Sequence, residues 1–458
     1  MKRFGIEFEL KNKPALDGDF IPLYRWEQAY LKGAKEPIAV ALEREDGKTA
    51  VIDTKIYGTE EMKEADCFYI ERLVKYLLWA KGGFHVMICG NKGVYDYVAA
   101  SYAKDGARAF DFKTMGDVYE HPFTVEHLSY GDRPAEKDAS APVGGHLDGC
   151  RIGFDAGGSD RKVSAVVDGK PVFSEEVVWF PKTNSDPDYH FQGIVDALKT
   201  AASKMPRVDA VGVSSAGIFI NDRTRLSSLF LKVSPEDFDA KVKDIYIRAA
   251  KELGDIPVQV ANDGDVTALA GAMGLEDTGV LGIAMGTSEA GGYVDRKGNI
   301  TGWLNELAFT PVDASESAAV DEWSGDTGCG VKYFSQDAVI KLAPRAGIFL
   351  NEDLSPAEKL KVVQTMANDG DENALDVFRS IGTYLGHTIP LYAQVYDLKH
   401  LLILGRVTSG KGGDLILEEC RKVLAEEYPE IQVNVQLPDE KTRRVGQSVA
   451  AAGLPAIR

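Results

Sequence analysis

The sequence has few cysteines, none of them in a CxxC pair, and no long apolar run. Five cysteines are scattered over 458 residues, which is typical of reduced thiols in a cytosolic protein and argues against a disulfide framework. No uninterrupted apolar stretch approaches the roughly 20 residues of a membrane-spanning helix, and the first 20 residues contain no apolar signal-peptide core. We therefore expect a cytoplasmic protein with no membrane partner.

Positive charge is also scarce. The chain has 52 Lys and Arg against 70 Asp and Glu, a formal net charge of -18. Because a phosphate backbone attracts a basic surface, this balance disfavours nucleic acid as a partner. Hydrophobic residues make up 44% of a chain that is too long for one ordinary core, so the composition predicts two or three domains.

A segment rich in Gly, Pro, Ala and Asp divides the chain and predicts a linker at residues 131–150. Before it, residues 1–130 have a mixed α/β pattern that includes a helical period over 68–80, and their role is not apparent from the sequence. After it, strands joined by glycine turns alternate with helices in two similar series. This pattern predicts an α/β fold of two lobes, 151–260 and 261–440, with a ligand cleft between them.

Three strands in this region end in glycine-rich loops. Free backbone N–H groups in such loops approach phosphate oxygens, and a carboxylate at a strand end holds Mg²⁺ directly or through water. One such turn alone is more often an ordinary hairpin, but three in this order favour nucleotide binding. The candidate residues are Asp155, Gly157, Gly158, Ser159 and Lys162 in the first loop, Gly286, Thr287 and Ser288 in the second, and Gly405 and Ser409 in the third.

The order and spacing of these loops resemble the ROK family (repressors, open reading frames and sugar kinases) from about residue 151 to the C-terminus. DAGGS at 155–159 matches the family's DxGGT, and GTSEAGG at 286–292 matches part of its GTGxGGG. The resemblance implies the two-lobed actin-like (ribonuclease H-like) ATPase fold, with ATP bound by these loops and Mg²⁺ held through ATP by Asp155. It also implies a closing helix, within 441–458, that packs back on the first lobe.

Asn262 and Asp263 match the start of the family's NDANAAALAE segment. The resemblance implies that Asp263 is the catalytic base and Asn262 a sugar ligand. A sugar hydroxyl is a poor nucleophile, so a carboxylate must orient it and accept its proton as it attacks the γ-phosphate. The alternative interpretation is that either residue simply caps the helix that follows, and Asp265 is the neighbouring carboxylate without an assigned role.

Two further segments align with family motifs and depart from them. NELAF at 305–309 aligns with GEIGH, so Glu306 is retained as a sugar ligand while Phe309 replaces the histidine. Residues 322–329 align with the CxCGxxGCxE zinc cluster, but only Cys329 remains of its cysteines. Because structural Zn²⁺ requires four ligands, usually thiolates and imidazoles, we expect no structural zinc. The missing histidine leaves the identity of the sugar open.

The function that follows from the resemblance is ATP-dependent phosphorylation of a hexose or amino-sugar hydroxyl. The alternatives are a non-catalytic sugar-sensing regulator and a degenerate kinase that binds without turnover. Arg406 stands in the third loop where the family has glycine, and it either contacts the nucleotide or obstructs it. A homodimer is expected.

Overall fold

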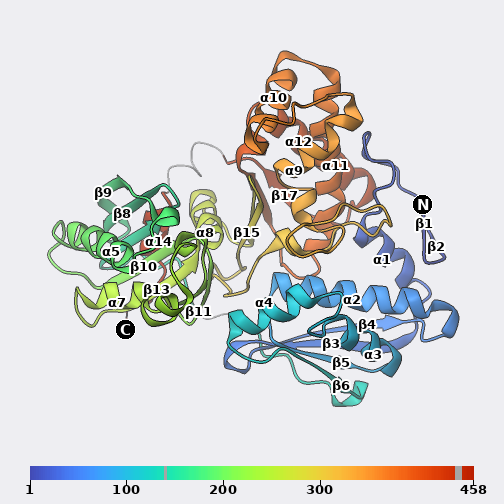
Figure 1. The fold of residues 1–458 in the computed structure, drawn as a ribbon, viewed down its shortest axis with the longest axis horizontal. Helices are drawn as coiled ribbons and strands as arrows, with labels where there is room; N and C mark the ends of the chain where they lie inside the picture. Colours follow the sequence, from blue (N-terminus) through green and yellow to red (C-terminus); the bar gives the residue numbers. More distant parts are fainter. Residues whose placement is uncertain (139–141, 439–445, 458) are drawn as a thin grey trace.

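The computed structural model of the protein describes residues 1–138, 142–438 and 446–457. It has two lobes and a separate N-terminal sheet domain (Figure 1). Within the described residues, no helix is both long enough and apolar enough to cross a membrane.

The N-terminal region forms two structures. Residues 36–128 build a four-stranded sheet in the order β4-β3-β5-β6, in which only β5 and β6 are parallel, packed with three helices. Its elements are β3 (Glu36–Glu43), β4 (Thr49–Ile56), α2 (Lys63–Ala80), β5 (His85–Cys89), α3 (Lys92–Ser101), α4 (Ala109–Tyr119) and β6 (Thr124–Leu128). Helix α2 contains the predicted helical segment 68–80 and is buried along almost its whole length.

The first 31 residues contact both that sheet domain and the second lobe. They contain β1 (Lys2–Arg3), β2 (Ile6–Glu7) and α1 (Leu23–Leu31), and α1 packs on α11 (Glu372–Tyr392). The carbonyl of Asn12 lies 2.8 Å from Nε2 of His387 in α11. The same segment also packs on α2, where the hydroxyl of Tyr30 donates to Asp66 and the rings of Trp26 and Phe68 lie 5.0 Å apart.

The first lobe has a five-stranded sheet in the order β13-β10-β7-β8-β9. The strands β13, β10 and β7 are parallel, and β7, β8 and β9 form an antiparallel meander. The elements are β7 (Cys150–Ala156), β8 (Asp160–Val167), β9 (Lys170–Val178), α5 (Pro187–Ala202), β10 (Ala210–Ser215), β11 (Ile218–Ile220), β12 (Arg223–Leu226), α6 (Pro235–Asp237), α7 (Ile245–Lys251) and β13 (Val258–Asn262).

The last helix, α14 (Gln447–Ala452), packs across β7, β8 and β10 of this lobe. Two glycines allow the contact. A Cβ at Gly153 would lie 1.6 Å from the carbonyl oxygen of Ser448, and one at Gly212 would lie 1.7 Å from that of Ala451. No side chain fits at either position, so the glycines fix the C-terminal helix on the sheet. Residues 441–445 and 458 of the predicted closing helix lie outside the described residues.

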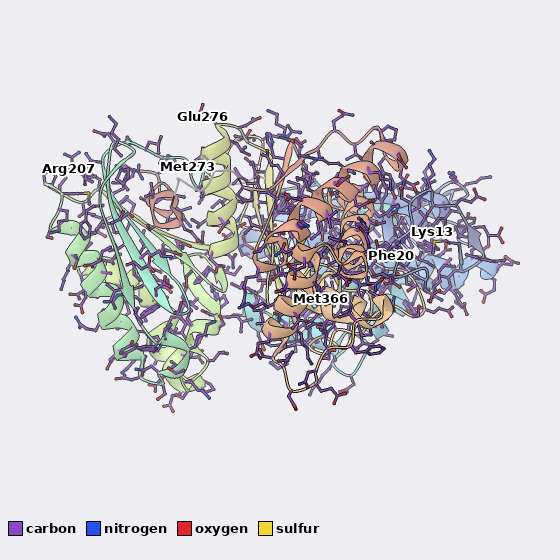
Figure 2. All side chains as sticks on the ribbon, turned by 90° about the horizontal axis from the view of Figure 1, so that it is seen from above. Lys13, Phe20, Arg207, Met273, Glu276 and Met366 are labelled. Carbon is purple, nitrogen blue, oxygen red and sulfur yellow. The ribbon has the colours of Figure 1, made fainter. Side chains whose placement is uncertain are left out.

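The second lobe has a four-stranded sheet in the order β15-β14-β16-β17, with β15 antiparallel and the others parallel. Its helices gather on one side of the lobe, and α8 stands between the two lobes, with Met273 and Glu276 near its end (Figures 1 and 2). The elements are α8 (Asp263–Leu275), β14 (Val280–Met285), β15 (Glu289–Val294), α9 (Gln336–Leu342), α10 (Pro356–Asp369), α11, β16 (His400–Leu404), α12 (Lys411–Glu427) and β17 (Asn434–Gln436).

The N-terminal sheet domain contacts both lobes. Glu120, which follows α4, forms ion pairs with Arg225 of β12 and, at 2.7 Å, with Lys243 of the first lobe. Helix α2 contacts the second lobe through residues 304–309 and 326. Part of the predicted linker is also anchored, because the buried carboxylate of Asp138 lies 2.7 Å from the Nζ of Lys81.

Candidate functional site

A cleft of about 920 Å³ lies between the lobes. The first lobe contributes Asp155 and Lys162, and α8 contributes Thr267 and Gly271. The second lobe and the C-terminal helix complete the lining with Leu402, Leu404, Gly405, Thr408, Ser409, Gly410, Asp414, Gln447 and Ser448, among others. Leucines beside glycines, hydroxyls and a helix start suit a ligand with an apolar ring and an anionic group. Asp155, Lys162, Gly405 and Ser409 are therefore brought together as the sequence predicts.

Asp155 is the next-to-last residue of β7, lines the cleft and is 8% exposed. The hydroxyl of Ser214 donates to its Oδ1 at 2.9 Å. Burial raises the pKa of Asp155 to about 6, although the Ser214 hydrogen bond and the charge of Lys162 both act to lower it. Added positive charge at this carboxylate would thus be stabilising, as expected of a residue that holds a cation.

The glycine turn after Asp155 is braced by an aromatic side chain. The indole N–H of Trp179 donates to the carbonyl of Gly157 at 2.8 Å, and its backbone N–H donates to Ser159 at 3.1 Å. Lys182 lies against the turn, since a Cβ at Gly158 would come 2.7 Å from its Cε. The charge of Lys182 also acts on Asp263. Lys182 lies in a short 3₁₀ turn, Pro181–Thr183, and no motif in the sequence marks it.

The second and third loops meet through Arg406. Its Nη2 donates to the hydroxyl of Thr287 at 2.7 Å, so the two loops lie side by side. Gly405 has φ +98°, and a Cβ there would lie 2.4 Å from the carbonyl oxygen of Met285. Glycine is therefore required where the third loop turns. Within the second loop, the N–H of Gly286 donates to the carbonyl of Ser288 at 2.9 Å.

Asp263 is the first residue of α8, and the residue before it caps the helix. Asn262 accepts the N–H of Gly264 at 2.7 Å through Oδ1 and donates to the carbonyl of Gly217 at 2.7 Å through Nδ2. The capping interpretation thus holds for Asn262. Burial raises the pKa of Asp263, while the N–H of Gly264 acts to lower it. Gln447 donates to the Asp263 carbonyl at 2.8 Å, which ties the C-terminal helix to this position.

Two more carboxylates lie near Asp263. Burial, followed by the charges of Asp263 and Asp265, raises the pKa of Glu306 to about 7. Asp265 accepts the N–H of Tyr293 at 3.0 Å and the side-chain amide of Asn305 at 2.8 Å. Asp265 therefore anchors the loop next to Glu306. It does so from the first turn of α8, three residues after the cap at Asn262.

The N-terminal domain holds the Glu306 loop from the other side. The N–H groups of Asn305 and Glu306 donate to the carbonyls of Ala80 and Trp79 at 2.9 Å each, at the end of α2. Phe309 packs on the ring of Trp79, with ring centroids 4.3 Å apart. The residue at the family's histidine position thus faces the N-terminal domain. Sequence reasoning missed these partners because they lie more than 200 residues away along the chain.

The donors near Cys329 do not fit a structural zinc. The Cys329 sulfur lies 4.0 Å from the Ser324 hydroxyl, and burial raises the pKa of the thiol to about 12, which favours the protonated form. Asp321 is occupied by hydrogen bonds from the Ser324 N–H and hydroxyl. Among the described residues, no three His, Cys, Asp or Glu side chains are grouped to hold a metal.

The family model described as "ROK family" matches residues 151–455. No curated relative matches the sequence. The ROK hexokinase of Thermus thermophilus superposes with a TM-score of 0.52 at 17% identity, over 66% of this chain and 97% of that one. A ROK glucokinase from Streptomyces griseus, solved with glucose and AMPPNP, gives a TM-score of 0.42 at 22% identity, over 66% of this chain and 98% of that one.

A ROK transcriptional regulator, a homologue of the E. coli MLC protein, gives a TM-score of 0.49 at 16% identity, over 70% of this chain and 81% of that one. The hexokinase superposition, at 17% identity, establishes the fold alone, and the family model covers well over half of the chain. The predicted two-lobed fold is confirmed: the chain belongs to the ROK family and has the actin-like ATPase fold.

Proposed function

We propose that this protein is a cytoplasmic ATP-dependent sugar kinase in which Asp263 is the general base. The observation that carries the proposal is the half-buried Asp263 carboxylate at the start of α8, close enough to Asp155 for their charges to interact. A base with a raised pKa accepts a hydroxyl proton more readily. The neighbouring positive charge of Lys182 acts in the opposite direction and helps to keep Asp263 ionised.

The nucleotide and the sugar are assigned to different ends of the site. The nucleotide is assigned to the cleft lined by Leu402, Leu404 and Gly405. Its phosphates are assigned to the glycine loops at 157–159 and 286–288, which follow Asp155 and adjoin Arg406. Asp155 is the residue suited to hold Mg²⁺ with bound ATP, and the ion would neutralise phosphate charge. Lys162 and Arg406 add positive charge on the same side.

The acceptor hydroxyl is proposed to lie between Asp263 and Glu306. With its pKa near 7, Glu306 is able to accept or donate a hydrogen bond to a sugar hydroxyl at neutral pH. The amide of Asn262 is engaged in capping, so its contribution to the sugar is to hold the start of α8. Phe309 lies against Trp79 and supplies no polar contact at the histidine position, which favours a sugar other than those the family histidine selects.

The same aromatic contact is the observation that keeps a second candidate open, a sugar-sensing protein without turnover. The two functions differ in one measurable respect. A kinase releases ADP when its sugar is added, whereas a sensor binds sugar and leaves ATP intact.

The test is ADP release from Mg·ATP with a panel of hexoses and amino sugars. We expect sugar-dependent turnover that Asp263→Asn lowers by at least about 10²-fold, the lower end of the contribution of a positioned base. Asp188→Asn, on an exposed part of the first lobe, is the matched control and should retain activity. Sugar binding without ADP release by the unmodified protein would overturn the kinase proposal and favour the sensor.

A further inference from the structure

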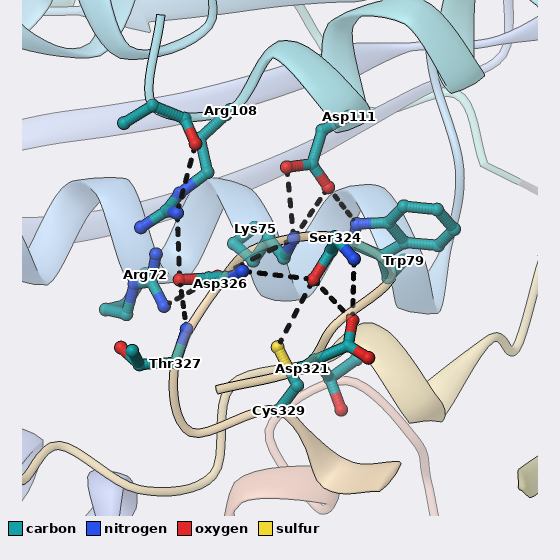
Figure 3. A network of polar contacts seen from close by, with 12 residues as sticks. Arg72, Lys75, Trp79, Arg108, Asp111, Asp321, Ser324, Asp326, Thr327 and Cys329 are labelled. Carbon is teal, nitrogen blue, oxygen red and sulfur yellow. Dashed lines mark hydrogen bonds and ion pairs between the residues drawn. The ribbon is translucent and has the colours of Figure 1, made fainter. Parts of the chain in front are cut away.

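A buried cluster of six charged side chains joins the N-terminal domain to the second lobe (Figure 3). The N-terminal domain contributes all three cations and two of the carboxylates, and the second lobe contributes one carboxylate, Asp326. The six are Glu71, Arg72, Lys75, Arg108, Asp111 and Asp326. Arg108 is 15% exposed, and the side chains of the other five are at most 4% exposed.

Three cationic side chains form ion pairs with Asp326. Arg72 Nη1 lies 2.9 Å from its Oδ2, Arg108 Nη1 lies 2.8 Å from its Oδ1, and Lys75 Nζ lies 3.6 Å from its Oδ2. Burial alone would raise the pKa of Asp326, but these cations hold it at about 2. Asp326 is therefore ionised at every pH at which the protein is expected to work.

The remaining carboxylates balance the charge on the domain side. Glu71 binds Arg72 and Arg108, each with a nitrogen 2.6 Å from one of its oxygens, and Asp111 lies 2.7 Å from Lys75. The six groups sum to zero charge. Pairing offsets the cost of burying these charges, whereas removal of one member leaves an uncompensated charge.

The cluster lies where the family's zinc motif aligns and where this chain lacks zinc ligands. Asp326 falls within the aligned segment 322–329, between Ser324 and Cys329. In a metal site of that kind, the ion crosslinks a loop that has little core of its own. Here the loop is crosslinked by side chains from another domain.

Helix α2 connects this cluster to the acceptor side of the cleft. Arg72, Lys75 and Trp79 lie at i, i+3 and i+7 and so share one face of the helix. The first two bind Asp326, and Trp79 contacts Phe309 and accepts the N–H of Glu306. One rigid helix thus holds both the 322–329 segment and Glu306.

We propose that Arg72, Arg108 and Asp326 are positioning residues for the acceptor site, and that the N-terminal domain supplies through them the crosslink that the zinc motif would otherwise supply. The inference rests on the proposed function for its kinetic consequence. Its structural consequence, a Glu306 loop ordered by the N-terminal domain, does not depend on that function.

The test compares Asp326→Asn in the full chain with Asp117→Asn, a matched change in an exposed ion pair of α4. Hydrogen exchange over residues 303–309 is measured first, and the metal content of the purified protein is measured by mass spectrometry. We expect faster exchange over 303–309 in Asp326→Asn only, no stoichiometric zinc, and unchanged activity on treatment with a chelator at saturating Mg²⁺.

Kinetic and binding measurements separate a positioning role from general destabilisation of the protein. For Asp326→Asn we expect KM for the sugar to rise about tenfold or more while the Kd for ATP changes less than about twofold. If Asp326→Asn does not fold, Arg72→Lys replaces it, because lysine keeps the charge but loses the forked geometry. Unchanged exchange over 303–309 in a folded variant, or one bound zinc per chain, would overturn the inference. A wild-type protein without turnover would overturn the kinase proposal alone, since the exchange result still decides the positioning role.

Discussion

The ion cluster at Asp326 makes a quantitative prediction about stability. Arg72 and Asp326 are both at most 3% exposed and lie 2.9 Å apart. Removing one partner of such a pair costs about 3–5 kcal/mol, because the other charge stays buried without its counterion. Asp326→Asn and Arg72→Met should each lower the free energy of unfolding by about that amount.

The double variant tests whether the two losses share a cause. When both charges are removed, neither is left unpaired, and Glu71 keeps Arg108 as its partner. The double variant should therefore be more stable than the sum of the single losses predicts, by about 2 kcal/mol or more, within the range for residues in one network.

Urea unfolding followed by tryptophan fluorescence measures these differences. Because the chain has several domains, the transition assigned to the N-terminal domain and second lobe is the one to compare. The exposed pair of Lys113 and Asp117 is the control, and its removal should change stability by less than about 1 kcal/mol. Strict additivity of the Arg72 and Asp326 losses would refute the reasoning, since it would mean that the two side chains do not stabilise each other.

Two further predictions concern the cleft and the core behind it. Arg406→Ala should weaken ATP binding by about tenfold or more in calorimetry, because a charge-assisted hydrogen bond contributes about 1.5–3 kcal/mol and Arg406 stands beside the second phosphate loop at Thr287. Glu289 is buried with its pKa raised to about 8, so the folded state keeps a proton that the unfolded chain releases above about pH 4.5. The stability that this bound proton contributes is thus fully present below about pH 4.5 and is lost as the pH rises through about 8. Glu289→Gln should remove this dependence and gain up to about 4 kcal/mol over the wild type between pH 5 and 8 in urea melts.

Each of these has a clear contrary result. Tighter ATP binding by Arg406→Ala would mean that the arginine obstructs the nucleotide, the other alternative that the sequence leaves open. Parallel stability curves for Glu289→Gln and the wild type between pH 5 and 8 would mean that Glu289 is ionised in the folded state.

The sequence by itself determined the elements of the site that depend on neighbours along the chain. The glycine turn after Asp155 and the cap at Asn262 are local features, set by residue type and by the next few residues. Asp155 and the loop at Gly405 follow strands of different sheets, so it is the packing of the two lobes that brings them to the same cleft. The absence of zinc ligands around Cys329 was likewise apparent from residue types alone.

Only the tertiary structure decided which distant residues support these elements. Arg72 is 254 residues from Asp326, and Gln447 is 184 residues from Asp263. In the sequence, Arg72 and Lys75 are charges on a helix, whose usual place is the solvated face. Their burial depends on a partner carboxylate from another domain, and an ion pair leaves no periodic pattern by which sequence could match its two members. Local structure was therefore predictable, and the role of the N-terminal domain was not, because electrostatic pairing is fixed by distance in space.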